Sequence, residues 1–344
     1  MRDIEFWQAL LSLDLPPSRA RALLDRLGPS CLSVEDLRAS DPFAEASKRV
    51  KPRRGSPARH PVGDVRVLEL GSAEYPKALS ESEDPPPALF VRGSLVDCDE
   101  PAVAIVGTRG ASSYGKAVAR QIASELAKGG VTVVSGGAQG VDANAHLGAL
   151  EAGGRTIAVL GSGLDRPYPV SNRGLFDRIA QSGAVVSQFP LGAKPDRWRF
   201  PLRNYTIAGL VRAVVVVEAP EQSGSLITAR AAADEGKLVF VTPGPITSTT
   251  HRGGFRLIND GATLLYTPDQ VFEGLGIARR VAQPVAPSVT PMQRKILDSL
   301  GVEPILVDSL GDALDIPPGE LLAELTTLEI LGLVLKSGAG YSKL

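Results

Sequence analysis

A short basic and aromatic segment, residues 194–204, carries the clearest chemistry in this sequence. The side chains in it that could contact a ligand are Lys194, Arg197, Trp198, Arg199, Phe200, Arg203 and Asn204. Cations of this kind bind phosphates, and aromatic rings stack on unpaired bases. Because a duplex hides its base faces, the combination favours a single nucleic-acid strand as ligand. A buried lid is the alternative, since aromatic rings are usually part of a core.

Small residues follow four apolar runs of the central sequence. Those that could contact an anion are Gly107, Thr108, Arg109, Ser135, Gly136, Gly137, Ala138, Ser223, Gly224 and Ser225, with a further Gly-Ser-Gly at 161–163. Small side chains let backbone amides approach a phosphate, and a helix N-terminus favours one. In any single loop the glycines could instead serve the turn alone. Four such loops together favour an anion site, with Arg109 at its floor.

These loops must be positioned by an α/β fold. Apolar runs occur at residues 103–106, 131–134, 156–160, 184–187, 213–217 and 238–241, and helical patterns separate most of them. Strands that are hydrophobic on both faces and are linked by helices are typical of a doubly wound parallel sheet. Ligands of such sheets bind beyond the carboxyl ends of the strands, where the small-residue loops fall.

Smaller segments flank this core. Residues 1–45 predict short amphipathic helices, similar to a sterile-alpha-motif (SAM) or helix-hairpin-helix (HhH) module, and residues 65–275 form the core. Residues 46–64 predict a basic, solvated linker, with an auxiliary phosphate-binding arm as the alternative. Residues 276–290 predict an Ala/Pro linker. Residues 291–344 predict three helices and a hairpin, which together suggest a winged-helix domain.

The predicted winged-helix domain is acidic. It holds four lysine and arginine residues against eight aspartate and glutamate residues, and its third predicted helix has no cation. Counterion release does not drive such a surface onto phosphates. We therefore expect this domain to contact protein or to tune the core, and not to read DNA.

Other functions find little support in the sequence. The glycines match neither a dinucleotide fingerprint nor a P-loop, so no cofactor is expected. Asp142 and His146 share a helical face and could serve acid/base chemistry or a metal, but a hydrogen-bonded structural histidine is the favoured interpretation. Two distant cysteines make a zinc site improbable. Without a signal peptide or a membrane-length apolar run, we expect a soluble cytoplasmic protein that does not contact the membrane.

Several short motifs follow one another across the whole predicted core. They are VAIVGTR at 103–109, YG at 114–115, SGGAQGVD at 135–142, AH at 145–146, GRTIAVLG at 154–161, YP at 168–169, FPLRN at 200–204, SGSLITA at 223–229, PG at 243–244, LI at 257–258 and GA at 261–262. Together these motifs resemble the DNA-processing protein A (DprA/Smf) family, and their combination is highly specific. The helical module and the acidic tail also resemble domains of many family members.

The resemblance implies an extended Rossmann-like core that binds single-stranded DNA and catalyses no reaction. It further implies a homodimer that protects incoming single strands and helps to load the RecA recombinase in natural transformation and homologous recombination. In the crevice, Arg109, Arg197 and Arg199 would contact phosphates, and Phe200 with Trp198 would contact a base. Arg203 and Asn204 would hold that wall in place.

The sequence departs from the family pattern at Gln139, where a basic residue is usual, and at Tyr205 and Thr206, which replace a basic-aliphatic pair. Both changes remove charge from the expected crevice. An alternative function is a nucleotide-binding enzyme of the phosphoribohydrolase type, although the PGGxGT-type motif of those enzymes and its catalytic glutamate are not matched here. A scaffold that acts through the acidic tail is a third hypothesis.

Overall fold

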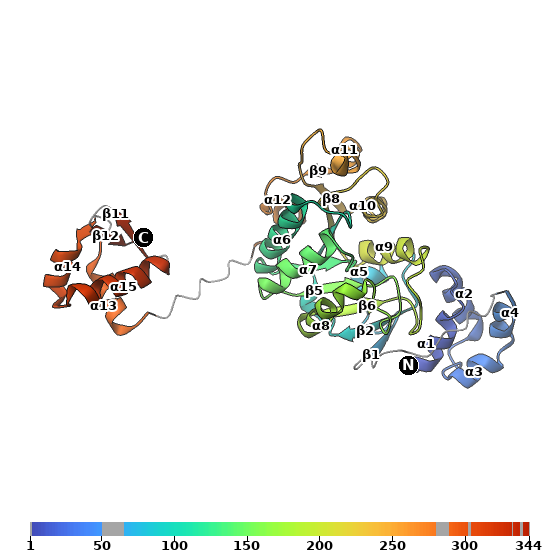
Figure 1. Ribbon diagram of the computed structural model, residues 1–344. Coiled ribbons are helices and arrows are strands. Elements are labelled where there is room, and N and C mark those ends of the chain that lie inside the picture. The colour runs from blue at the N-terminus through green and yellow to red at the C-terminus, as the bar shows by residue number, and fades with distance from the viewer. Residues whose placement is uncertain are drawn as a thin grey trace. The chain divides into compact units, whose positions relative to one another are not determined.

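The computed structural model describes residues 2–49, 65–279, 289–301, 304–331, 333–337 and 340–343. The chain divides into two compact units, residues 1–281 and 282–344 (Figure 1). Most of the predicted basic linker and of the predicted Ala/Pro linker lies outside the described residues. The domain boundaries drawn from the sequence stay a prediction.

Within the described residues, the first unit holds a nine-stranded sheet of strand order β1-β2-β6-β5-β4-β3-β7-β8-β9. From β6 to β9 in that order the strands are parallel. Strand β2 pairs antiparallel with both β1 and β6. The strands are β1 Val65–Glu69, β2 Ala88–Gly93, β3 Ala102–Val106, β4 Thr132–Ser135, β5 Thr156–Val159, β6 Ala184–Ser187, β7 Ala213–Val216, β8 Leu238–Val241 and β9 Thr263–Leu264. The predicted doubly wound parallel sheet is confirmed, and an antiparallel edge extends it.

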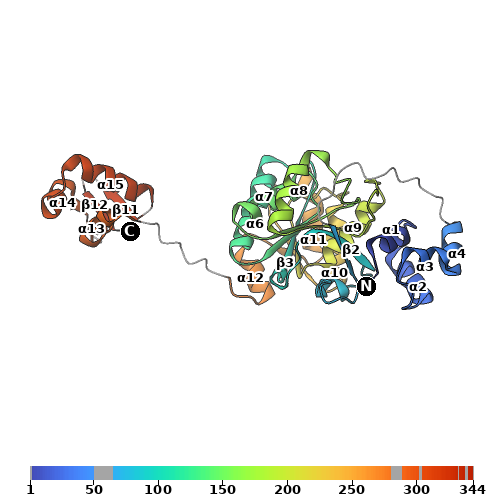
Figure 2. The same cartoon turned by 90° about the horizontal axis from the view of Figure 1, so that it is seen from below.

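Helices cover both faces of this sheet. The helices that connect the strands are α5 Lys77–Ser80, α6 Ser113–Lys128, α7 Val141–Glu151, α8 Arg173–Ser182, α9 Arg199–Gly209, α10 Ser225–Asp234 and α11 Arg252–Asn259, with 3₁₀ turns at Asp97–Asp99, Val170–Asn172 and Thr249–His251. Helix α12 Asp269–Leu275 follows the last strand, β9. Figure 2 shows α6, α7 and α8 gathered on the same side of the unit.

Strand β3 illustrates why the sequences of the central strands are continuously apolar. Ala104 and Val106 belong to the core cluster that α5, α9, α10 and α11 cover, whereas Val103 and Ile105 belong to the cluster under α6, α7 and α12. Successive side chains of a strand point to opposite faces. With both faces covered, no polar alternation is left to mark the strand.

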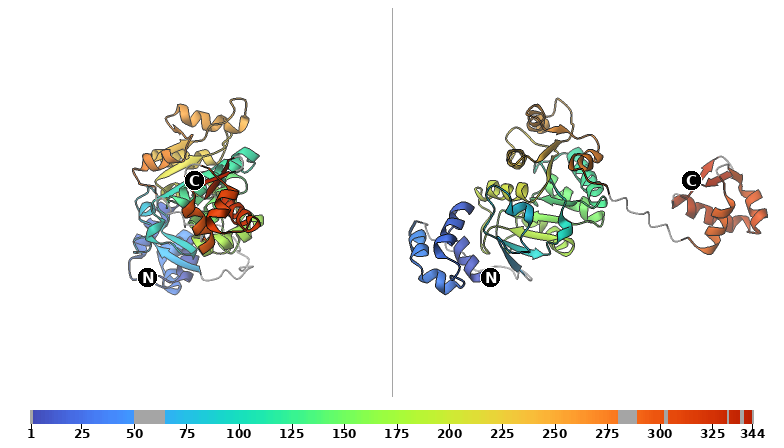
Figure 3. Two further views of the ribbon diagram at one scale, coloured as in Figure 1. Left: turned by 90° about the vertical axis from the view of Figure 1, so that its left-hand side faces the viewer. Right: turned by 180° about the vertical axis from the view of Figure 1, so that it is seen from behind.

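Four helices precede the sheet: α1 Ile4–Leu11, α2 Pro17–Leu27, α3 Val34–Ala39 and α4 Asp41–Arg49. Phe6, Trp7 and Leu10 of α1 are buried in one cluster with Phe90 of β2 and Phe176 of α8. These helices lie beside the edge formed by β1 and β2, as Figure 1 and both views of Figure 3 show. The predicted amphipathic helices are thus packed on the sheet rather than separate from it.

The second unit has a core of its own. Its elements are α13 Pro291–Ser299, β10 Ile305–Leu306, α14 Val307–Leu314, α15 Pro318–Ile330, β11 Val334–Ser337 and β12 Gly340–Lys343. The strands form an antiparallel sheet of order β10-β12-β11. Ile296, Leu321, Leu325 and Tyr341 are among its buried residues. Three helices and a hairpin therefore form as the sequence predicts.

Among all the residues described, no helix combines the length and the apolar character needed to cross a membrane.

Candidate functional site

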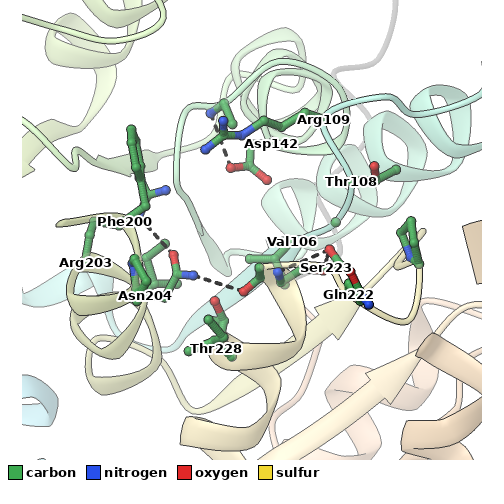
Figure 4. A pocket seen from close by; sticks show the side chains of 18 of the residues that line it. Val106, Thr108, Arg109, Asp142, Phe200, Arg203, Asn204, Gln222, Ser223 and Thr228 are labelled. Carbon is green, nitrogen blue, oxygen red and sulfur yellow. Dashed lines mark hydrogen bonds between the residues drawn. The ribbon is translucent and has the colours of Figure 1, made fainter. Parts of the chain in front are cut away.

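A cavity of about 500 Å³ lies beyond the carboxyl ends of β3 and β7 (Figure 4). It is bounded by the loop after β3, by α9 and by the loop that leads into α10. Its lining residues are Val106, Gly107, Thr108, Arg109, Ala138, Asp142, Arg197, Phe200, Pro201, Arg203, Asn204, Ile207, Pro220, Gln222, Ser223, Gly224, Ser225, Ile227 and Thr228. This is the location that the parallel-sheet topology predicts for a ligand.

The cavity brings together most of the residues that the sequence singled out. Those in its lining are Gly107, Thr108, Arg109, Ala138, Arg197, Phe200, Arg203, Asn204, Ser223, Gly224 and Ser225. Those outside the lining are Ser135, Gly136, Gly137, Lys194, Trp198 and Arg199. Three segments far apart in sequence thus meet at the cavity. Residues 135–137 of the loop after β4 do not line it, nor do Lys194, Trp198 and Arg199 of the basic and aromatic segment.

Helix α9 explains which members of the basic and aromatic segment reach the cavity. Phe200, Arg203, Asn204 and Ile207 have the i, i+3, i+4, i+7 spacing that places side chains on one helical face. Pro201 lies in the first turn, where the missing amide proton breaks no helical hydrogen bond. The segment is therefore a helix whose one face lines the cavity, rather than an extended strip with all its side chains turned to a ligand.

Arg199 corrects the expectation of a phosphate contact. Its side chain is only 4% exposed, and its Nη2 donates to both carboxylate oxygens of Asp14 at 2.8 and 2.9 Å. Its Nη1 donates to the carbonyl of Lys194 at 2.6 Å, and its guanidinium lies over the Trp198 ring. The Trp198 ring also meets Phe189 edge-on. These contacts join α9 to the N-terminal helices and turn Arg199 and Trp198 away from the cavity.

The loop after β4 also differs from the anion loop that the sequence suggested. The Ser135 hydroxyl is buried and donates to the carbonyl of Ile105 at 2.7 Å. A Cβ on Gly136 would lie 2.7 Å from the guanidinium of Arg203, so only glycine leaves room for that side chain. Gly137 has a φ of +66°, a left-handed backbone that favours glycine. These residues shape the floor of the site and do not line the cavity.

Arg203 is the buried centre of that floor. Its Nη1 donates to the carbonyl of Gly136 at 2.6 Å and also to the carbonyl of Val159, and its Nε donates to Oδ1 of Asn204 at 3.1 Å. Burial lowers the pKa of Arg203 to about 10, and Asp142 opposes this effect. The guanidinium therefore stays charged near neutral pH. It ties α9 to the ends of β4 and β5.

Asp142 is the carboxylate of the cavity. It lies in the first turn of α7, is 7% exposed, and accepts a hydrogen bond from the amide of Ala138 at 3.3 Å. Burial raises its pKa, which the charge of Arg203 acts to lower. The sequence paired Asp142 with His146, but Nδ1 of His146 instead bonds the hydroxyl of Thr156 at 2.7 Å. Burial lowers the pKa of His146 to about 3, which fits a neutral structural histidine.

Phe200 is half-buried and contacts charged and aromatic neighbours. The guanidinium carbons of Arg109 and Arg203 lie 5.0 and 5.8 Å from its ring centroid, and the Tyr168 ring lies 5.9 Å away. A Cβ on Gly161, just after β5, would approach the ring to 2.8 Å. The position of the ring is therefore fixed by groups from several strand ends.

Two exposed cations line this site. Arg109 and Arg197 are exposed, and neither forms an ion pair with any residue in the described part of the chain. The third loop adds backbone amides at the start of α10, where the Ser223 and Ser225 hydroxyls lie 2.7 Å apart. The Nδ2 of Asn204 donates to the carbonyl of Gly224 at 3.0 Å, which fixes this loop against α9. Exposed guanidinium groups and a helix N-terminus form a site suited to an anion.

Some lining residues were missed by the sequence reasoning. Gln222 directly precedes Ser223, and Thr228 lies one helical turn after Ser225, so their places follow once α10 is known. Tyr168 was noted only as part of a motif, yet its ring contacts Phe200 and is 42% exposed. The helical spacing of Thr228 from Ser225 on α10 could have predicted that Thr228 lines the cavity.

Fold and cavity define a Rossmann-like domain with a crevice suited to an anion, and comparisons with known proteins identify its family. The family described as DNA recombination-mediator protein A matches residues 66–276, and the DprA winged helix domain matches residues 280–340. Protein Smf of Synechocystis is 38% identical over an alignment of 314 residues that covers 80% of this chain and 79% of that protein. The chain belongs to the DNA recombination-mediator protein A family.

Two solved structures are similar to this chain. The X-ray structure of DNA processing protein A from Streptococcus pneumoniae has a TM-score of 0.67 and 32% identity, covering 79% of this chain and 98% of that one. The structure of DNA processing protein A from Helicobacter pylori has a TM-score of 0.56 and 33% identity, covering 62% and 95%. The report of the latter describes a single-stranded DNA binding mode.

Proposed function

We propose that this chain binds single-stranded DNA in the cavity between α9 and the loop after β3. One observation carries the proposal: the exposed guanidinium of Arg109 lies 5.0 Å from the centroid of the Phe200 ring. A phosphate contact and a base-stacking ring thus occur side by side. Arg197 adds a second exposed cation to the same lining. The single-strand binding described for the Helicobacter pylori protein supports the proposal.

The ring favours a single strand over a duplex. Phe200 offers a π-face, which any unstacked base can use without a sequence-specific contact. A base in a duplex has its faces covered by its neighbours and cannot stack on a protein ring without being extruded. Arg109 and Arg197 would bind the backbone of either form. The preference for a single strand therefore comes from Phe200, and the salt dependence comes from the two arginines.

The central experiment is a titration of labelled poly-dT, with matched duplex as competitor, on the wild type and on Arg109→Ala. We expect the variant to bind more weakly and the slope of log K against log salt to fall by about one. Arg230→Ala, which removes an exposed arginine of α10 outside the cavity lining, is the matched control. Equal affinity for duplex and single strand, or an unchanged Arg109→Ala, would overturn the proposal.

The cellular role that we propose follows the family. The chain protects incoming single strands and loads the RecA recombinase in natural transformation and homologous recombination, in the cytoplasm and without catalysing a reaction. A nucleoside-monophosphate hydrolysis assay on the same preparation tests the phosphoribohydrolase alternative. Hydrolysis that survives repurification would contradict a purely binding role.

We also propose that the functional form is a homodimer. Strand β9 lies at an open edge of the sheet, and unpaired edge strands are templates for pairing with a second chain. Leu264 of β9 is 42% exposed and the nearby Tyr266 is 73% exposed, which is unusual for large apolar side chains. Light scattering of the wild type and of Leu264→Lys tests this, and a wild type that stays monomeric at high concentration contradicts it.

The winged-helix unit is proposed to contact protein. In α15, the helix that would read DNA in many winged-helix domains, Glu320, Glu324 and Glu329 supply negative charge and no cation occurs. Binding of duplex DNA to residues 289–344 at moderate salt would contradict this proposal.

A further inference from the structure

A second ring, that of Tyr114, lies on the connection that carries Arg109. Arg109 follows β3, and Tyr114 is the second residue of α6. Five residue-to-residue steps separate the two Cα atoms, which therefore lie at most about 18 Å apart even if the chain is fully extended. A strand that passes over Arg109 therefore has Tyr114 close to its path.

The first turn of α6 is fixed in place by a buried carboxylate. Glu218 follows β7, is 1% exposed, and accepts hydrogen bonds from the amide of Ser112 at 2.9 Å and from its hydroxyl at 2.6 Å. The Ser112 hydroxyl in turn accepts from the amide of Gly115 at 3.1 Å and caps the helix. A Cβ on Gly115 would clash with Glu218, so glycine is required at this contact. The backbone that carries Tyr114 is thus held to the end of β7.

The Tyr114 side chain is fixed as well. Its hydroxyl donates to the carbonyl of Pro243 at 3.0 Å. Its ring centroid lies 6.1 Å from that of His251, which is buried and stacks on Phe255 at 6.0 Å and 26°. Nevertheless 45% of Tyr114 is exposed. A rigid, half-exposed ring is a good stacking surface, because its side-chain entropy has already been lost.

Cations also adjoin this ring and its partner His251 in the sequence. Lys116 of α6 and Arg252 at the start of α11 are exposed, and within the ranges that the structure covers neither forms an ion pair. Glu218 does not offset them at the surface, since it is buried in hydrogen bonds to Ser112. A ring that is not fully buried, together with exposed cations, is the combination that also defines the Phe200 site.

We infer that Tyr114 forms a second base-stacking subsite for a single strand that leaves the Phe200 crevice over Arg109. The subsite takes a nucleobase without sequence preference. Lys116, two residues after Tyr114, and Arg252, which directly follows the ring partner His251, would contact the adjoining phosphates. This inference rests on the proposed function. The competing interpretation is that Tyr114 only ties α6 to the loop after β8.

Oligonucleotide length separates the two interpretations. We expect Tyr114→Ala to weaken binding of oligo-dT of twelve nucleotides by about 5- to 150-fold, the loss of one stacked base. Binding of a four-nucleotide oligo-dT, which the Phe200 crevice alone holds, should change by less than about twofold. Tyr114→Phe keeps the ring and should bind the longer strand nearly as the wild type does. Tyr205→Ala, which removes an exposed tyrosine of α9 outside the cavity lining, is the matched control.

The outcomes are distinguishable. An equal loss for both lengths, or no loss for either, overturns the Tyr114 subsite while leaving the crevice intact. A wild type that binds neither length overturns the proposed function and this inference with it. As an independent measurement, 5-iodouridine placed at successive positions of the longer strand should crosslink to the peptide that contains Tyr114 from a different nucleotide than the one that reaches Phe200. If no position crosslinks to the Tyr114 peptide although the Phe200 peptide is labelled, the inference is wrong.

Discussion

The rim and the floor of the crevice use charge in opposite ways. The rim, Arg109 and Arg197, is exposed and forms no ion pair with any residue that the structure describes. The floor, Arg203 with Asp142, is buried and hydrogen-bonded to neighbouring backbone groups. An exposed cation can exchange water for a phosphate, whereas a buried one holds its partners in place. Arg197 and Arg203 are close in sequence and yet have different roles, and four comparisons between variants test the contrast.

The largest effect is expected for the floor. Arg203→Met should lower the free energy of unfolding by about 3–5 kcal/mol, because Asp142 stays buried without its cation. The carbonyls of Gly136 and Val159 also lose their donor. Arg109→Met at the rim should stay within about 0.5 kcal/mol of the wild type. Urea denaturation measures both, and similar losses for the two variants would remove the distinction between rim and floor.

The next largest effect separates two arginines of the same segment. Arg199→Ala should destabilise the protein by about 2–3 kcal/mol, because it removes charged hydrogen bonds to Asp14 in a poorly exposed place. Arg197→Ala should leave stability unchanged and weaken single-strand binding with a salt slope lower by about one. Thermal unfolding and oligo-dT titration of both variants are the measurements. The reverse assignment of the two losses would show that Arg199, and not Arg197, faces the strand.

A smaller loss of stability is expected at Gly136, where a side chain has no room beside Arg203. Gly136→Ala should cost about 1–3 kcal/mol, because the added Cβ presses on the guanidinium of Arg203. Gly110→Ala is the control in the loop after β3, where a Cβ would meet nothing within 4 Å. Both variants can be compared by chemical denaturation. If Gly136→Ala is as stable as Gly110→Ala, the fit of Arg203 against this glycine is not a constraint.

The smallest expected effect is a change in pH dependence. Burial raises the pKa of Asp142 above its ordinary value of 3.8, so the folded state holds that proton more tightly than the unfolded state does. The resulting contribution to stability is fully present below pH 3.8 and is lost as pH rises through the raised pKa. The wild type should therefore lose stability relative to Asp142→Asn as pH increases in that range. Unfolding free energies of both proteins, measured across pH, would contradict this if their difference changed in the opposite direction.

Much of the fold could be predicted from local patterns. The apolar runs from Val103 to Val241 and the glycines that end them indicate the parallel sheet and the edge where a ligand binds, because both properties are carried by short stretches of sequence. The pairing of Arg199 with Asp14 could not be predicted, since the two residues lie 185 positions apart. The role of Gly136 was equally hidden, because it depends on where Arg203 places its guanidinium.

The helical spacing of the residues of α9 that line the cavity was the main sequence pattern that was missed. Phe200, Arg203, Asn204 and Ile207 follow a helical period, but Pro201 interrupts the segment and suggests an extended chain. Proline is tolerated in the first helical turn, which is where Pro201 lies. A helix that begins just before this proline places Arg199 on a different face from Phe200, and the helical period alone is enough to show it.

The contact between Asp14 and Arg199 has a practical consequence for shortened chains. Removing the N-terminal helices to obtain a minimal core would also remove a carboxylate that pairs with a guanidinium only 4% exposed. Arg199 would keep Asp196 at 3.2 Å but lose both hydrogen bonds to Asp14, and it is the first residue of α9, directly before Phe200. A truncated protein would therefore report on a crevice whose main helix has lost an anchor. Its weaker binding could not be attributed to DNA contacts made by the deleted helices.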